Sequence, residues 1–413
     1  MKPVASPPRA TDAPSGVPLL DLGRQTASLG DEIVAALARV CRTGAFVLGP
    51  EVADLENRIA EYCGARFAVG CASGSDALLL ALMAFDVGPG DEVIVPSFTF
   101  FATASAVTRL GARPVFADIE PATYNVDAAA VESLLSPQTK AIVPVHLFGQ
   151  AAEMAALRRI AAGAGVPLIE DAAQAIGAEY GGERVGSMGA VGCLSFYPTK
   201  NLGGAGDGGM LTTNDAQLAD RLGMLRVHGM RPRYYHEVVG INSRLDAFQA
   251  AVLNVKLTHL EHWNEQRQLN AARYASLFEQ VGLERFLVLP TTQPGRRHVW
   301  NQYVVRVPDG RRDALRQYLG EVGVGSEVYY PLGLHQQECF RRFDRRCGTM
   351  LETERAAREV LALPIYPELT EAEQRFVVEQ IAAFFEPNAG GHPLGGPKYL
   401  VHPAARQQRS GRA

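Results

Sequence analysis

Short apolar runs bounded by turn residues recur along the chain from about residue 50 to residue 215. Stretches with the apolar spacing of helices lie between several of them, for example at 76–85 and 151–164. Buried strands that alternate with helices are typical of a mostly parallel sheet covered on both faces. The pattern predicts an α/β domain with a seven-stranded, mostly parallel sheet, whose strands lie at 67–71, 92–96, 114–118, 141–145, 167–171, 192–196 and 209–213.

The pattern changes at about residue 244, where a long helical stretch begins at Leu245 and continues to Gln280. After it, the spacing of apolar residues predicts two strands and two helices. We expect the strands near 300–307 and at 325–330, and the helices near 311–322 and 371–385. This mixture predicts a second, smaller α+β domain.

Both ends of the chain differ from the rest in composition. Residues 1–16 are rich in proline, alanine and small polar residues, which predicts a disordered tail. Residues 387–413 are rich in glycine and proline, and carry dispersed basic residues without an acidic one. Such a basic tail can bind nucleic acid, but a flexible, solvated terminus is the more common case, and we favour it. We therefore expect a large domain at 17–243 and a small domain at 244–386.

The composition is that of an ordinary enzyme. The 413 residues have a formal net charge of −4, which gives no reason to expect nucleic-acid binding. The six cysteines form no CxxC pair, so we expect reduced thiols and no zinc or other metal framework. No apolar run is long enough for a membrane span, and no signal peptide is evident. These features predict a cytoplasmic enzyme that does not associate with membranes.

Polar residues end several of the predicted strands, and ligands of open α/β sheets bind at that edge. Lys200 lies between Ser195, at the end of one strand, and a glycine-rich loop, while Asp171 ends an earlier apolar strand. A lysine so placed can hold an aldehyde as a Schiff base, and a poorly solvated aspartate can pair with a pyridinium nitrogen. The two together predict a site for pyridoxal 5′-phosphate (PLP). The alternatives are a solvated lysine and a helix-capping aspartate.

Further residues complete this predicted pocket. Gln174 follows Asp171 closely enough to reach the ring hydroxyl, and Ser195 can donate to the phosphate. The segment Ser73-Gly74-Ser75-Asp76 joins a strand to a helix, where free N–H groups favour an anion. Its alternative is an ordinary helix cap by Ser75 or Asp76.

Three phenylalanines, Phe98, Phe100 and Phe101, follow another strand. Three aromatic rings within four positions of a strand cannot all face one core. We expect Phe100 to stack on the pyridine ring, with core packing as the alternative.

Several stretches resemble one known family in this order along the chain. They are Gly74-Ser-Asp-Ala-Leu, Pro-Ser-Phe-Thr-Phe-Phe-Ala-Thr-Ala, Val-His-Leu-Phe-Gly, Glu-Asp-Ala-Ala-Gln, Ser-Phe-Tyr-Pro-Thr-Lys and Gly-Ile-Asn-Ser-Arg-Leu-Asp-Ala-Phe-Gln-Ala-Ala. The chain is similar, from about residue 17 to residue 386, to the DegT/DnrJ/EryC1/StrS family of PLP-dependent sugar aminotransferases. The resemblance implies PLP fold type I, that of aspartate aminotransferase, and a homodimer with active sites at the subunit interface.

The same resemblance implies roles for individual residues. Lys200 takes the place of the Schiff-base lysine, where dehydratases of the family carry histidine. Arg244 and Tyr330 fall where relatives contact the substrate, and Asn242 is expected to reach the phosphate of the partner subunit. The expected cofactor-binding residues are Gly74, Ser75, Asp76, Phe100, Asp171, Gln174, Ser195, Lys200 and Asn242.

The stretch 226–236 resembles members that install a 3-amino group, including those that act on oxidised UDP-N-acetylglucosamine uronates. Within it, Arg231 and Arg233 suit the diphosphate of a nucleotide sugar, although a solvated basic loop is an equal alternative.

The expected reaction is therefore transfer of an amino group from glutamate (or glutamine) to a keto sugar nucleotide, with a 3-keto sugar favoured. The amino sugar would serve glycan or natural-product biosynthesis. The alternatives are a 4-keto sugar aminotransferase, a PLP-dependent sugar dehydratase, and a non-catalytic PLP-binding regulator. A regulator would need a DNA-binding segment, and the sequence has no evident helix-turn-helix pattern.

Overall fold

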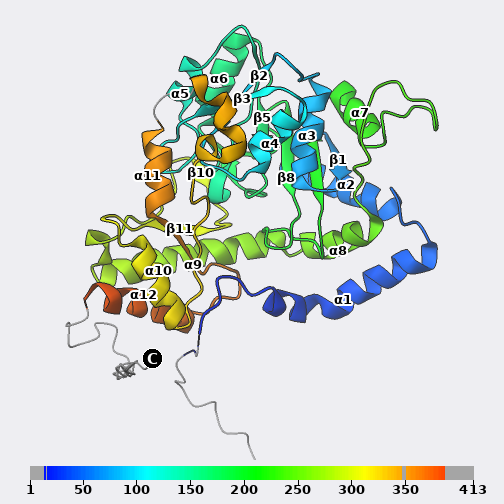
Figure 1. Cartoon of the computed structure of the whole chain (residues 1–413). Helices are drawn as coiled ribbons and strands as arrows, with labels where there is room; N and C mark the ends of the chain where they lie inside the picture. Colours follow the sequence, from blue (N-terminus) through cyan, green and yellow to red (C-terminus); the bar gives the residue numbers. More distant parts are fainter. Residues whose placement is uncertain (1–13, 15, 347–349, 387–413) are drawn as a thin grey trace, which may run out of the picture.

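The computed structural model describes residue 14, residues 16–346 and residues 350–386 (Figure 1). The tails predicted at 1–16 and 387–413 lie outside the described residues, apart from residues 14 and 16. Among the described residues, no helix is both long and apolar enough to cross a bilayer.

The predicted central sheet is present, and all seven predicted runs contribute a strand. Four strands pair in the order β1 (Phe67–Cys71), β9 (Gly209–Thr213), β8 (Val191–Ser195) and β5 (Ile169–Asp171). Three more pair in the order β4 (Thr139–Ile142), β2 (Glu92–Pro96) and β3 (Arg113–Ala117). Single bridges from Ile142 to Leu168 and from Val145 to Asp171 join β4 to β5. Of these seven strands, β9 alone runs in the direction opposite to the other six, so the sheet is mostly parallel.

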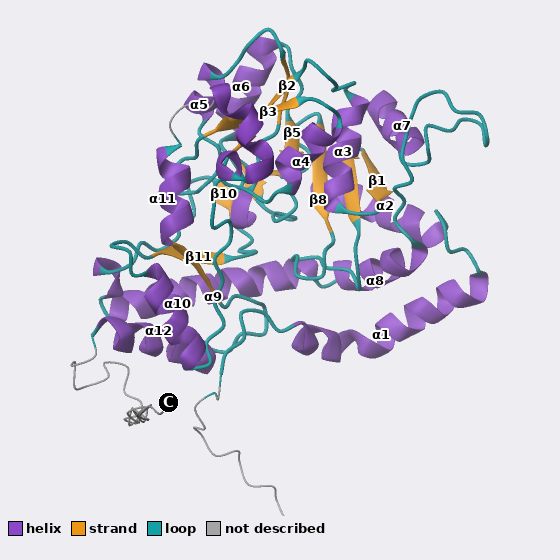
Figure 2. Cartoon of the chain, in the orientation of Figure 1, coloured by secondary structure: helices purple, strands orange, loops and turns teal. Residues whose placement is uncertain are grey.

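Helices cover both faces of this sheet, as Figure 2 shows. One hydrophobic cluster joins the sheet to α3 (Gly74–Ala84), α4 (Ala102–Arg109) and α7 (Ala216–Leu225). The other joins it to α2 (Pro50–Cys63), α5 (Ala128–Ser133), α6 (Met154–Ala164) and α8 (Ala247–Leu257). Within β2, Val93 and Val95 belong to the first cluster and Ile94 to the second. This alternation follows from the two-residue period of a strand.

A smaller unit follows α8. The long helix α9 (Leu260–Gln280) packs with α10 (Arg312–Glu321) and α12 (Glu371–Phe385) around a core of its own. Its two-stranded sheet pairs β11 (Tyr303–Arg306) with β12 (Val360–Leu363), which follows α11 (Leu351–Glu359). Short elements complete the chain: η1 (Leu147–Gly149), β6 (Glu179–Tyr180), β7 (Glu183–Arg184), η2 (Leu283–Arg285), β10 (Arg296–Arg297), η3 (Leu334–Gln336) and η4 (Glu338–Arg346).

Two predictions for this part were wrong. The segment 325–330 is not a strand, because only Glu327 makes a bridge, to Ala362, and Tyr330 turns into the left-handed region with φ 59°. The strand beside β11 is β12, which the sequence analysis missed. The helical stretch predicted from Leu245 to Gln280 is two helices, α8 and α9, interrupted at Thr258 and His259.

The N-terminal helix α1 (Leu22–Thr43), which the sequence analysis did not identify, runs along α8 (Figure 1). Ala36 and Val40 of α1 pack on Ala247 and Ala251 of α8. Small residues at this contact let the two helices approach closely.

The small unit is fastened to the carboxyl ends of the outer strands. Oγ of Ser97, at the end of β2, lies 2.6 Å from Nδ1 of His335. The carboxylate of Asp118, just after β3, accepts hydrogen bonds from the N–H groups of Glu352 (3.0 Å) and Thr353 (2.8 Å) in the first turn of α11. An acidic side chain at a helix N-terminus is favourable, so Asp118 stabilises this junction.

The approach of β9 to the start of α3 gives a testable prediction. A Cβ on Gly209 would lie 2.4 Å from the carbonyl carbon of Ser73, whereas one on Gly163, in α6, would meet nothing within 4 Å. We expect Gly209→Ala to lower the free energy of unfolding by about 1–3 kcal/mol. The matched control Gly163→Ala should raise it by about 0.5–1 kcal/mol, because alanine is the better helix former. Urea unfolding of the cofactor-free protein measures both, and an unchanged midpoint for Gly209→Ala would contradict the close approach.

Candidate functional site

Lys200 lies in the loop between β8 and β9, at the carboxyl edge of the sheet. Residues 197–200 form a turn, in which the N–H of Lys200 donates to the carbonyl of Tyr197 at 2.8 Å. The next residue, Asn201, is buried and anchors the loop. Its side-chain amide donates to Oδ1 of Asn264 in α9 (2.7 Å) and to the carbonyl of Val299 (2.9 Å). The lysine therefore stands on a fixed backbone.

The ammonium group of Lys200 is destabilised where it lies. The side chain is partly buried, and this burial lowers the pKa of Lys200 to about 8, while the charge of Asp171 acts in the opposite direction. A lysine with such a pKa is partly neutral near physiological pH, as an amine nucleophile requires.

Asp171 ends β5, the strand beside β8, and is 4% exposed. Oδ2 accepts a hydrogen bond from the hydroxyl of Thr103 (2.8 Å), and Oδ1 accepts one from the N–H of Ala173 (3.3 Å). Burial raises the pKa of Asp171, and these two hydrogen bonds and the charge of Lys200 oppose the rise. A cation placed at this carboxylate would be strongly favoured.

The sequence analysis missed Thr103. It lies in the first turn of α4, and its hydroxyl is 3.2 Å from that of Thr99. Thr99 lies before α4, so no helical spacing links the two threonines, and the local sequence carried no signal for the contact of Thr103 with Asp171.

Gln174 is fixed at both ends of its amide. Its Oε1 accepts a hydrogen bond from the N–H of Phe148 (2.8 Å), and its Nε2 donates to the hydroxyl of Tyr330 (3.0 Å). The ring of Tyr330 in turn stacks on Phe148, with centroids 6.3 Å apart. The structure thus brings Tyr330 to Gln174, a contact that the sequence analysis did not anticipate.

The start of α3 lies against Ser195. Ser73 caps this helix by accepting from the N–H of Asp76 at 3.1 Å, so the alternative of a cap by Ser75 or Asp76 was wrong. The carboxylate of Asp76 instead accepts a hydrogen bond from Ser243 (2.8 Å). A Cβ on Gly74 would lie only 2.6 Å from Cβ of Ser195. The missing side chain at Gly74 leaves a cradle for an anion between a helix N-terminus and a serine hydroxyl.

The three phenylalanines after β2 differ in exposure. Phe98 is fully buried, which fits core packing, whereas Phe100 is 60% exposed and Phe101 is 45% exposed. Phe100 is therefore free to cover a ligand.

The remaining predicted residues lie in or after the loop that follows α7, which projects away from the sheet (Figure 1). Arg231 forms an ion pair with Asp220 of α7, and Arg233 stacks on the ring of Tyr234 at 4.8 Å. Asn242 is exposed, and Arg244 is partly buried. Among the contacts of the described residues, none joins Arg231 or Arg233 to Lys200, Asp171 or Gln174.

Residues 27–382 match the profile of the DegT/DnrJ/EryC1/StrS aminotransferase family. The chain belongs to this family.

Relatives of this aminotransferase carry two kinds of name. It is 51% identical to a protein named "Pleiotropic regulatory protein" from Geobacillus stearothermophilus, over 89% of this chain and 98% of the relative. It is 44% identical to the UDP-N-acetyl-3-dehydro-α-D-glucosamine 3-aminotransferase of Acidithiobacillus ferrooxidans, over 87% and 95% of the two chains. Among solved structures, NtdA from Bacillus subtilis with bound cofactor PMP matches with a TM-score of 0.84 and 32% identity, over 90% of this chain and 86% of that one.

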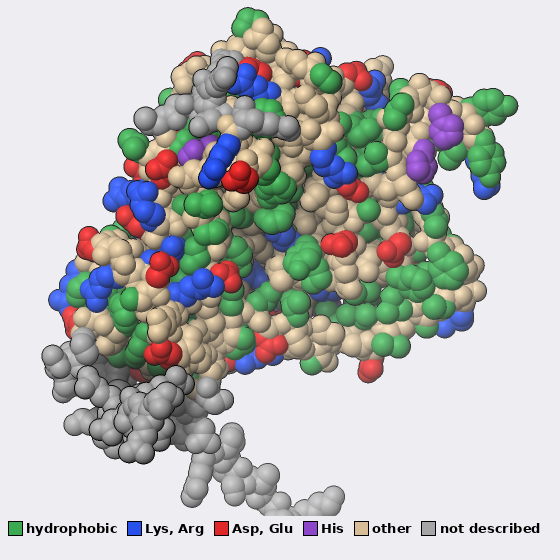
Figure 3. Space-filling view, in the orientation of Figure 1, with side chains coloured by type: hydrophobic (Ala, Val, Ile, Leu, Met, Phe, Trp, Pro, Cys, Tyr) green, Lys and Arg blue, Asp and Glu red, His purple; other side chains and the backbone are tan. Residues whose placement is uncertain are grey.

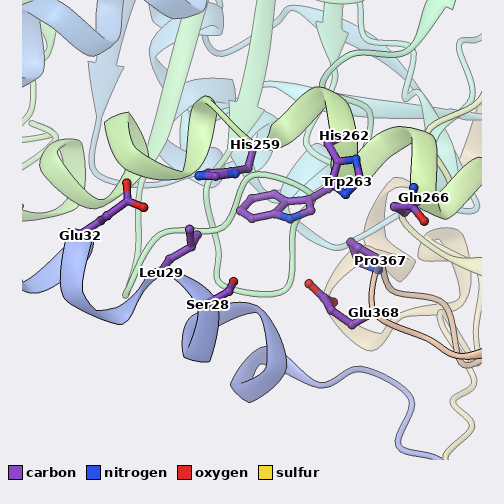
Figure 4. A pocket seen from close by; sticks show the side chains of 9 residues that line it. All are labelled: Ser28, Leu29, Glu32, His259, His262, Trp263, Gln266, Pro367 and Glu368. Carbon is purple, nitrogen blue, oxygen red and sulfur yellow. The ribbon is translucent and has the colours of Figure 1, made fainter.

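A cavity of about 440 Å³ lies between α1 and α9 of this aminotransferase (Figure 4). Trp263 lies at its centre, and the next residue, Asn264, accepts a hydrogen bond from the side chain of Asn201. Nζ of Lys256 lies 5.8 Å from the centre of the Trp263 ring and donates to the carbonyl of Gly203. The cavity therefore borders the support of the lysine loop. Its lining residues are Ser28, Leu29, Glu32, His259, His262, Trp263, Gln266, Pro367 and Glu368.

The lowered pKa of Lys200 predicts how stability depends on pH. Below about pH 8 the folded cofactor-free protein must bury a charged amine, and this cost disappears as pH rises towards the ordinary lysine pKa of 10.5. We expect Lys200→Met to be about 1–3 kcal/mol more stable than the wild type at pH 7, with the difference shrinking between pH 8 and pH 10.5. Urea unfolding at several pH values measures it, with Lys140→Met as control. A constant difference across this range would refute the assignment.

Proposed function

We propose that this chain is a PLP-dependent transaminase that transfers an amino group from L-glutamate (or glutamine) to carbon 3 of a keto sugar linked to a nucleotide. The observation that carries the proposal is the pair of Lys200, which is partly buried, and Asp171, which is buried, because burial lowers the pKa of the amine and raises that of the carboxyl. A carbonyl cofactor with a basic ring nitrogen satisfies both groups at once.

The residues present fit PLP. When bound, PLP supplies a carbonyl group that exchanges amines and a ring that accepts electrons. Asp171 would hold a proton on the ring nitrogen, and Lys200 would carry a proton to and from the reacting carbon. Gln174, held by Phe148 and Tyr330, would orient the ring hydroxyl.

The phosphate would lie in the cradle at the start of α3. Ser75, Ser195 and the free N–H groups at Gly74 supply donors there. Asp76 would act by holding Ser243, because its carboxylate accepts from that hydroxyl and has no proton to donate. Phe100, exposed beside this edge, would cover the ring.

The names of several relatives support amination at carbon 3. Relatives between 42% and 44% identical are named for 3-amino or 3-oxo sugars, linked to UDP in two cases and to dTDP in two others. Arg244 and Tyr330 would contact the sugar. In this proposal the amino sugar serves glycan or natural-product biosynthesis.

We further propose that the active form is a homodimer with shared sites. Phe46, Val47 and Leu48, between α1 and α2, are 46%, 57% and 36% exposed. Figure 3 shows hydrophobic side chains gathered on this face. Exposed apolar patches of this kind mark protein interfaces. A second copy would cover them and bring its Asn242 to the phosphate and its Arg231 and Arg233 to the nucleotide diphosphate.

Two other functions fit the site less well. A PLP-dependent sugar dehydratase needs no lysine that is linked to the cofactor. Lys200 occupies the position at which dehydratases of the family carry histidine. A regulator is suggested only by the printed names of two relatives, a pleiotropic regulatory protein and a sensory transduction protein. A regulator that acts on DNA would need a DNA-binding segment, and the sequence has no evident helix-turn-helix pattern. A 4-keto sugar remains the alternative substrate, and it requires the same residues.

Loss of Lys200 tests the reaction. The wild type should be yellow with PLP, and the colour should fade when glutamate is added. Lys200→Ala should lack the colour and lose at least about 1,000-fold in kcat, because its nucleophile and proton carrier are gone. Mass spectrometry of products from 3-keto and 4-keto sugars on UDP and dTDP measures the activity. A Lys200→Ala protein that still transaminated would refute the proposal.

Mixing two inactive variants tests the shared sites. Lys200→Ala and Asn242→Ala should each have less than about a tenth of wild-type activity. In a refolded one-to-one mixture, half of the dimers would be mixed and would contain one intact site each. The mixture should therefore recover about a quarter of wild-type activity. Activity equal to the mean of the two separate variants would show that Asn242 acts within its own subunit or not at all.

A further inference from the structure

Two buried residues beside the cofactor residues, His146 and Glu170, have no role in the function proposed above. Glu170 lies in β5 directly before Asp171, and His146 follows β4. Both are 0% exposed, and Nε2 of His146 lies 2.9 Å from Oε2 of Glu170. Burying such a pair costs free energy, so a specific arrangement must compensate for it.

The carboxylate of Glu170 is fully satisfied. Besides His146, its oxygens accept hydrogen bonds from the N–H groups of Gly186 (2.9 Å), Met188 (2.8 Å) and Gly189 (2.7 Å). Burial raises the pKa of Glu170, but His146 and these N–H groups outweigh it, and the net shift is downward. Glu170 is thus a fixed anion that ties β5 to the turn before β8.

The hydrogen bonds of His146 define its tautomer. The N–H of Ala152 donates to Nδ1 at 3.1 Å, so Nδ1 carries no proton and Nε2 donates to Glu170. The backbone of His146 is joined to the same place, since its N–H donates to the carbonyl of Asp171 at 3.0 Å. His146 therefore contacts β5 through both its ring and its main chain.

His146 also begins the segment that holds Gln174. It immediately precedes η1, whose Phe148 donates its N–H to Gln174 and adopts φ 58°. A non-glycine residue in the left-handed region is strained unless its surroundings hold it there. Asn125 holds the same segment by accepting from the N–H of Leu147 at 2.9 Å.

We infer that His146 and Glu170 are positioning residues that fix Asp171 and Gln174 relative to each other and so set the seat of the cofactor ring. Successive residues of a strand point to opposite faces, so Glu170 lies on one face of β5 while Asp171 faces the site. The pair touches neither cofactor nor substrate, and it acts through its two neighbours. The inference rests on the proposed use of PLP.

The test is a pH titration of the visible absorption band of PLP linked to Lys200, together with the PLP dissociation constant. Glu170→Gln removes a fixed negative charge close to Asp171, which makes the protonated form of the linkage less stable. We expect the midpoint to fall by about half a pH unit or more, and the dissociation constant to rise about tenfold. His146→Ala keeps the charge and should raise the dissociation constant about tenfold without moving the midpoint as far.

Glu183→Gln is the matched control, because Glu183 is a half-exposed carboxylate paired with Arg158 on the surface. It should leave both quantities unchanged. The inference is overturned if Glu170→Gln and His146→Ala lower only the unfolding midpoint of the cofactor-free protein while the bound cofactor behaves as in the wild type. If Glu170→Gln does not fold, His146→Ala decides alone, since it retains the three backbone bonds to Glu170. A wild type without the band would overturn the proposed function as well, which separates the two failures.

Discussion

The negative charge buried at the end of β5 is the constraint on which the rest of the structure depends. Two consecutive carboxylates, Glu170 and Asp171, are both removed from water there. Glu170 is satisfied by an imidazole and three N–H groups, so its charge needs nothing further. The carboxylate of Asp171 accepts one hydrogen bond from a hydroxyl group and one long hydrogen bond from an N–H group. A positive charge beside it would therefore be stabilising. Glu170 is therefore a structural anion, whereas Asp171 is the carboxylate to which the proposed function assigns a ligand.

The order of the strands places other polar groups of the candidate site near Asp171. β5 and β8 are adjacent and parallel, so Asp171 and Lys200 lie near enough for their charges to interact although 28 residues separate them in the sequence. α3 then approaches Ser195 from the same edge, and the small unit contributes Tyr330. In the proposed function, three distant parts of the chain would supply the ring-nitrogen partner, the phosphate site and the support of Gln174. The antiparallel strand β9 begins beside the N-terminus of α3. Gly209 allows this close approach, because a Cβ at this position would clash with the backbone of Ser73.

Much of this could be predicted from the sequence, because it depends on local pattern. The runs at 67–71, 92–96 and 209–213 match β1, β2 and β9 residue for residue, since buried strands of a parallel sheet are short, apolar and bounded by turns. Lys200, Asp171 and Gln174 could be placed because strand ends share one edge. Three features could not be predicted: the contact of Thr103 with Asp171, the contact of Tyr330 with Gln174, and the pairing of β12 with β11. Each depends on which distant segments meet, and the residues involved are individually ordinary. The hydrogen bond between Asp76 and Ser243 could not be predicted for the same reason, because the two partners lie 167 positions apart in the sequence.

The anchoring of the lysine loop has an optical consequence. The chain contains two tryptophans, Trp263 and Trp300, and both adjoin residues that hold this loop. Trp263 lies under Lys256, which bonds to Gly203, while Trp300 sits between Val299 and Asn301, which both contact Asn201. The tryptophan fluorescence of the protein therefore originates from two side chains that adjoin the anchors of the lysine loop. The wavelength and the intensity of tryptophan emission should therefore report, without a label, how the lysine loop responds to each ligand.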